Sequence, residues 1–149
     1  MYTGKYIACL LALVVAGCSN SQSTTSPTTT TTTATSESDY TATLAIGGSF
    51  NSPPFTVAAA GTAAIDLESV TLTPTGPATL IQLGIGLSPT TTDGTGKTVC
   101  GSTTSSMTVA SGLTAQLTAS VTVGSYCVAV YDPGTLTVPV TFLVRAVHP

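Results

Sequence analysis

The side chains of this sequence that could act in acid–base or nucleophilic catalysis are few and scattered. His148 is the only histidine, and no residue near it in sequence would orient it as a base. Asp66 and Glu68 are two positions apart, so on a β-strand their carboxylates would share one face. We interpret them as two solvated acids. A desolvated Lys97 that activates a Ser or Thr hydroxyl is the one catalytic route left open. We expect no catalytic residue and no enzyme.

The segment Asp93-Gly-Thr-Gly-Lys97 is the candidate for a phosphate or calcium loop. A phosphate loop needs wider glycine spacing and a Lys-Ser/Thr pair that leads into a helix, while an EF-hand loop needs repeated acids and a closing glutamate. This segment has neither pattern, so we interpret it as a hairpin turn or surface loop. No histidines and cysteines have the spacing of a zinc site. We therefore expect no metal ion and no cofactor.

Composition narrows the choice of partners. Charged residues make up 6% of the 149 residues, so hydroxyl groups must cover much of the surface. The basic residues are Lys5, Lys97 and Arg145, against six acids. Nucleic-acid binding requires a cluster of basic side chains that neutralise phosphates. We therefore expect no nucleic-acid partner.

The N-terminus carries an export signal. Lys5 precedes the apolar run 6–16, which suits the core of a signal peptide and is shorter than the roughly 20 residues that span a membrane. The run ends in Val15-Ala16-Gly17-Cys18, which resembles the lipobox of bacterial lipoproteins. The resemblance implies that residues 1–17 are cleaved off and that Cys18 is acylated, with palmitate-type chains anchoring the protein to membrane lipid in the cell envelope. Ordinary signal-peptide cleavage, with Cys18 left as a thiol, is the alternative.

Residues 18–39 form a Ser/Thr-rich segment with no large apolar side chain. Such a segment cannot bury enough surface to offset the entropy of ordering, so we predict a disordered linker with a span of roughly 25–30 Å. O-linked sugars on this segment are an alternative to a plain spacer. Ser19, rather than an aspartate, follows Cys18, which by the same resemblance favours the outer membrane or cell surface over the inner membrane.

Cys100 and Cys127 are the two cysteines that remain beyond the linker. In an oxidising compartment such a pair forms a disulfide by default. Neither has a histidine or a further thiol near it in sequence, so a disulfide is favoured over a catalytic or metal-binding thiol. Because Cys100 follows a Gly-rich loop and Cys127 lies within a predicted strand, the bridge would fix that loop to a sheet.

Residues 40–149 show short β-branched segments of period two, separated by Gly, Pro, Asp and Asn. This pattern predicts one all-β domain, a small two-sheet β-sandwich of seven or eight strands. Within 62–72 the apolar residues change parity, which predicts a β-bulge near Ser69. The expected strands are 40–46, 55–59, 62–72, 80–87, 106–109, 113–121, 126–132 and 138–147.

The last third of the chain carries a second resemblance. Gly124-Ser-Tyr-Cys-Val-Ala-Val-Tyr-Asp132, followed by Val138-Pro-Val-Thr-Phe-Leu-Val144, resembles the closing hairpin of bacterial prepeptidase C-terminal domains. The resemblance implies a small secreted sandwich, in that family an accessory to secreted hydrolases. The family's acidic Asp-x-Asp-Leu pattern is replaced by Ile81-Gln-Leu83, so its ion-binding role does not carry over.

Three functional hypotheses follow. The first is a membrane-anchored structural or adhesion-type module with a cell-surface protein or glycan as its partner, favoured by a smooth hydroxyl surface. The second is a ligand-binding accessory module for glycan or calcium, favoured by an exposed cluster of Tyr40, Phe50 and Tyr131 or by convergent oxygens from Asp93 and Asp132. The third is a subunit that assembles by strand addition at a sheet edge.

Overall fold

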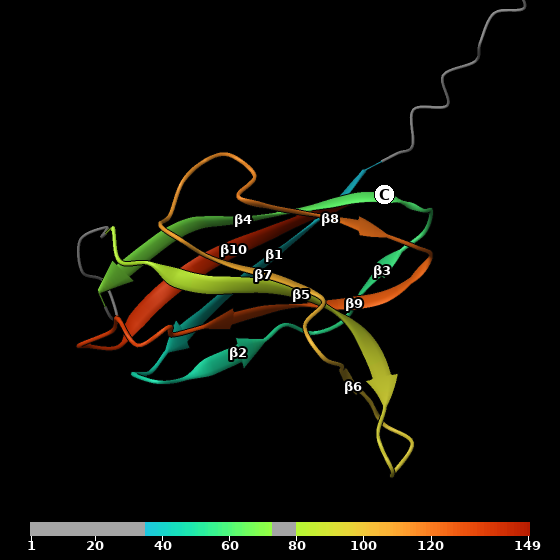
Figure 1. Ribbon diagram of the computed structural model, residues 1–149, viewed down its shortest axis with the longest axis horizontal. Helices are drawn as coiled ribbons and strands as arrows, with labels where there is room; N and C mark the ends of the chain where they lie inside the picture. Colours follow the sequence, from blue (N-terminus) through green and yellow to red (C-terminus); the bar gives the residue numbers. More distant parts are fainter. Residues whose placement is uncertain (1–34, 73–79) are drawn as a thin grey trace, which may run out of the picture. The chain divides into compact units, whose positions relative to one another are not determined.

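Residues 35–72 and 80–149 are described by the computed structural model shown in Figure 1. They form ten strands and no helix, so no helix among them is long and apolar enough to cross a membrane. The strands are β1 (Ser36–Leu44), β2 (Ser49–Asn51), β3 (Phe55–Val57), β4 (Gly61–Leu72), β5 (Leu83–Thr92), β6 (Thr98–Cys100), β7 (Ser105–Val109), β8 (Leu117–Val121), β9 (Gly124–Tyr131) and β10 (Val140–His148).

The strands form two antiparallel sheets that pack face to face. Sheet A has the order β1-β10-β4-β8, and sheet B has the order β2-β9-β5-β6, with β3 also pairing with β9 and β7 with β5. Every second residue of β10 is buried, as expected for a strand with one face on the core. The predicted all-β two-sheet sandwich is confirmed. Its largest fully buried side chains come from both sheets: Phe142, Leu44, Ile65, Leu67, Leu83, Ile85 and Leu87.

The predicted bulge in β4 is confirmed. Ser69 pairs with Leu143 and Leu67 pairs with Val144, which leaves Glu68 as the extra residue. Because a bulge reverses the alternation, both Leu67 before it and Val70 after it point into the core. The parity change in the sequence therefore reports a real shift in register.

Strand number and several boundaries differ from the prediction. The strands β2 and β6 are missing from it because three residues are too few to show a period-two pattern. The strand β1 begins at Ser36, so the last four residues of the predicted linker, up to Asp39, belong to sheet A. Their polar sequence hides this, since the strand exists through its pairing with β10. The strand β5 begins at Leu83 and continues through Pro89 to Thr92. Pro89 has no N–H to donate, but its carbonyl accepts a hydrogen bond from the Gly101 N–H, so the strand stays paired at this position.

The predicted closing hairpin is wrong. The strand β9 lies in sheet B and β10 in sheet A, and the connection between them carries the chain from one sheet to the other. At the start of β9, the Tyr126 hydroxyl accepts a hydrogen bond from the backbone N–H of Thr122 at 3.1 Å. This contact has the form of the tyrosine corner of Greek-key sandwiches, so the Gly-x-Tyr signal marks a sheet corner and not a hairpin.

Candidate functional site

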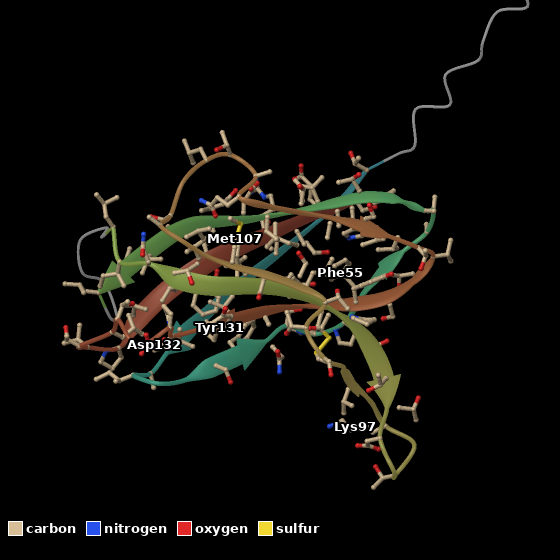
Figure 2. All side chains as sticks on the ribbon, in the orientation of Figure 1. Phe55, Lys97, Met107, Tyr131 and Asp132 are labelled. Carbon is tan, nitrogen blue, oxygen red and sulfur yellow. A yellow bond between two sulfur atoms is a disulfide. The ribbon has the colours of Figure 1, made fainter. Side chains whose placement is uncertain are left out.

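Cys100 and Cys127 form a disulfide, with their Cα atoms 5.9 Å apart. Cys127 is fully buried in β9 opposite Ser88 of β5, and Cys100 ends β6 opposite Thr90 of the same strand. The bridge lies at the base of the β5–β6 hairpin, which extends away from the sandwich (Figures 1 and 2). It joins two strands that both pair with β5 and so fixes this hairpin, as predicted. Both thiols are used in this bond.

The turn at the tip of the β5–β6 hairpin is held by Asp93. Its Oδ1 accepts hydrogen bonds from the Thr95 hydroxyl at 2.7 Å and from the backbone N–H groups of Thr95 and Lys97 at 2.8 and 3.0 Å. The Thr95 hydroxyl bond, followed by the two backbone bonds, holds the pKa of Asp93 below its ordinary value. Gly96 has a φ of +83°, a conformation that glycine adopts without strain. The interpretation of this segment as a hairpin turn is confirmed.

Lys97 is exposed at this hairpin tip (Figure 2). A lysine that activates a hydroxyl needs a desolvated amine within hydrogen-bonding reach of that hydroxyl. The exposed side chain of Lys97 does not have this environment.

Asp132 joins two loops at the other end of the sandwich. Its Oδ2 accepts a hydrogen bond from the Gly47 N–H at 2.8 Å, and its Oδ1 accepts three from the backbone of Gly134, Thr135 and Leu136 at 2.8–3.2 Å. The Gly47 bond is the largest cause of a lowered pKa at Asp132; partial burial opposes it, and the other three bonds add to it.

Asp93 and Asp132 do not converge. The hairpin that carries Lys97 and the loop that carries Asp132 lie at opposite ends of the molecule in Figure 2. Among residues 35–72 and 80–149, no three His, Cys, Asp or Glu side chains come close enough to hold a metal ion. The arrangement that would have favoured a calcium site is not formed by these two acids.

His148 ends β10 as part of the core and not as a frayed tail. It is 4% exposed, and its ring stacks on Phe55 with the centroids 4.5 Å apart. Its Nε2 lies 3.5 Å from the Ser38 hydroxyl, while its Nδ1 is buried without a hydrogen-bond partner in the described structure. The sequence reasoning missed Ser38 because it placed this residue in the linker. No pocket is found among residues 35–72 and 80–149.

Arg145 lies on the outer face of sheet A, between acids of β1 and β4. The Arg145 side chain contacts Asp39 through Nε at 2.8 Å and Glu68 through Nη1 at 2.8 Å. Asp66 lies opposite Arg145 in the β4–β10 register, with its Oδ1 buried and unpaired. Hydrogen bonding to Asp39 raises the pKa of Arg145, so the guanidinium stays charged. Glu68 is thus engaged in an ion pair.

Tyr40 and Phe50 pack against the core, whereas Tyr131 points away from it. Phe50 packs edge-to-face on the buried Phe142 with the centroids 5.3 Å apart, and Tyr40 packs against the core from β1. Tyr131 lies on the outer face of sheet B and covers Gly84, where an added Cβ would overlap its ring. The cluster of Tyr40, Phe50 and Tyr131 that would have favoured glycan binding does not form.

Two polar side chains complete the sheets in ways that the sequence does not signal. The Ser52 hydroxyl accepts a hydrogen bond from the Val128 N–H at 2.9 Å, next to Pro53 and Pro54, which cannot donate to the ladder. The side-chain oxygen of Gln116 accepts a hydrogen bond from the Leu67 N–H at 2.8 Å. It takes the place of a backbone partner, because β8 pairs with β4 only as far as Ile65. A lone Ser or Gln carries no pattern, and only the fold brings these partners together.

No family model matches this chain, and no curated protein matches it.

Proposed function

We propose that this chain is a cell-envelope lipoprotein, anchored to membrane lipid through acylated Cys18, whose β-sandwich acts as a non-catalytic structural or adhesion-type module. The proposed membrane anchoring rests on the lipobox-like Val15-Ala16-Gly17-Cys18 and on the Ser/Thr-rich segment that follows it. Both features lie outside the described residues. By the resemblance to bacterial lipoproteins, with Ser19 after the cysteine, the outer membrane or cell surface is the expected location.

The observation that supports a structural role is that most of the candidates for chemistry already have a structural partner. Cys100 and Cys127 are bonded to each other, and the acids of the two loops hold their own turns. Glu68 is paired with Arg145, and His148 is stacked in the core. The strands then present exposed hydroxyls to the solvent, among them Thr41, Thr43, Thr91, Thr92, Ser106, Thr108 and Thr118. Such a surface suits contact with a cell-surface protein or glycan.

The lipid anchor at Cys18 is tested by labelling cells with an alkyne analogue of palmitate. We expect the wild-type chain to incorporate the label and to enter the detergent phase, and Cys18→Ser to do neither. Cys9→Ser is the matched control, because it removes a thiol from the same apolar segment without changing the lipobox. Unchanged labelling of Cys18→Ser would refute the anchor. Photo-crosslinking from Thr108 on intact cells, followed by mass spectrometry, then identifies the partner; crosslinks to a soluble substrate that the protein converts would refute the non-catalytic role.

A further inference from the structure

The free edges of the two sheets are unequal. The strand β1 pairs with β10 over nine consecutive residues and has no strand on its other side among the described residues. The remaining edge strands are short: β7 and β8 have five residues each, and β2, β3 and β6 have three. Pro53 and Pro54 also interrupt the edge formed by β2 and β3, since proline has no N–H to donate. The longest free edge in the described structure is therefore β1.

The half of β1 from Tyr40 to Leu44 lacks the usual devices that protect an edge. Natural edge strands are blocked by lysine, proline or a bulge, because unpaired backbone groups are a template for another strand. The sequence of β1 contains no lysine, proline or glycine, and its register with β10 runs unbroken from Ser36 to Leu44. Its charges, Glu37 and Asp39, lie in the first half, so the half from Tyr40 to Leu44 is uncharged.

We propose that β1 pairs antiparallel with β1 of a second copy of this chain. Parallel pairing in register would place Asp39 against Asp39, and like charges directly opposite each other are unfavourable. Antiparallel pairing centred near Thr41 instead places Asp39 opposite Thr43 and brings the uncharged residues 40–42 of the two copies together. For a second β1 at this edge, the charge pattern therefore selects the antiparallel orientation.

The side chains of β1 that face the core support the same occupant. Tyr40 and Ala42 pack against the core but are only partly buried, because β1 has a neighbour on one side only. In the register centred on Thr41, Tyr40 of one copy lies opposite Ala42 of the other, so each ring covers a small side chain. About one backbone hydrogen bond forms for each paired residue. The two copies of sheet A then become one continuous sheet across a two-fold axis, a contact that closes on itself and gives a dimer.

This dimer goes beyond the proposed function and does not depend on acylation of Cys18. The test uses the full chain, analysed by sedimentation velocity over a range of concentrations. Thr43 is exposed on β1, and in the proposed pairing it lies opposite Asp39 of the other copy. We expect Thr43→Glu to raise the dissociation constant of the dimer at least tenfold and Thr43→Lys to leave it unchanged or lower it. Thr92→Glu, at the exposed outer end of β5, is the control and should have no effect.

The comparison of two charges at one position separates pairing at β1 from a general effect on the fold. Circular dichroism, together with the intact mass of the protein with its Cys100–Cys127 bridge, shows whether each variant is folded. If Thr43→Glu does not fold, Asp39→Lys combined with Thr43→Glu places a lysine of one copy opposite a glutamate of the other. This double variant should restore the dimer. A monomer at every concentration of the wild-type chain would overturn the proposal. So would equal effects of Thr43→Glu and Thr43→Lys, or a dimer that Thr43→Glu leaves intact.

Discussion

The two aspartate turns of this domain use the same chemistry over very different distances in the sequence. In the β5–β6 hairpin, Asp93 accepts hydrogen bonds from residues two and four positions away, Thr95 and Lys97. At the opposite end of the sandwich, Asp132 bonds its own turn and also Gly47, which is 85 positions away. The first aspartate shapes a loop, whereas the second connects two loops of the fold. A carboxylate that holds a turn can therefore stabilise a single loop or connect distant loops, and only its partners distinguish the two cases.

The disulfide adds a covalent link between β9 and β6, the returning strand of the hairpin that Asp93 shapes. The Cys100–Cys127 bond closes a loop between residues 27 positions apart in sequence, which in the chain-entropy picture stabilises the fold by about 3–4 kcal/mol. We expect Cys100→Ala combined with Cys127→Ala to lower the free energy of unfolding by about that amount, measured by urea titration. Reduced wild-type protein should lose the same amount. A double variant as stable as the oxidised wild type would show that the hairpin is held by other contacts.

The end that Asp132 connects is tightly packed where β5 and β9 meet. Gly84 lies under the ring of Tyr131, and an added methyl group would overlap that ring. We expect Gly84→Ala to cost about 1–3 kcal/mol, because the ring or the strand must move. Gly94→Ala in the hairpin turn is the matched control, since nothing lies within 4 Å of its Cβ position. Thermal unfolding of the two variants tests the comparison, and equal melting temperatures would contradict it.

The same contrast explains how much the sequence could predict. The bulge in β4 was predictable because the apolar residues around Ser69 change parity, and the disulfide was predictable because only two cysteines lie beyond the linker. Both signals are contained in a short segment or in a simple count. The placement of β9 and β10 in different sheets was not predictable, since a connection of this length suits a hairpin or a crossover.

The candidate site shows the same limit. The sequence suggested Asp93, Asp132 and Lys97 as residues to examine, and the structure determines what each of them does. Ser38 was missed because its neighbours are polar and typical of a linker. It lies in a strand only because β10, 110 positions later, contributes the register and the contact with His148. Contacts of this kind depend on pairing between distant segments, which no local pattern encodes.

Replacing Asp132 by asparagine tests its long-range bond. The asparagine Oδ1 can still accept from its own turn, but its amide nitrogen cannot accept from the Gly47 N–H. We expect Asp132→Asn to lower the melting temperature by a few degrees at neutral pH. The pKa of Asp132 is lowered in the folded state, so its contribution is present above the ordinary value of 3.8 and is lost as the pH falls below it. The melting temperature of the variant should therefore depend less on pH below about 4 than that of the wild type. Identical acid profiles would contradict this assignment.

The smallest effect is expected at the other aspartate. Asp93→Ala leaves the N–H groups of Thr95 and Lys97 without their acceptor, but the turn is exposed and water can replace the carboxylate. The bonds between the backbones of Asp93 and Lys97 and of Gly96 and Asp93 remain, so the hairpin keeps its register. We expect faster hydrogen exchange at the Lys97 amide and a melting temperature within experimental error of the wild type. If Asp93→Ala lowered the melting temperature as much as Asp132→Asn, the hairpin would be coupled to the core by more than the disulfide, and the distinction between a local and a connecting aspartate would fail.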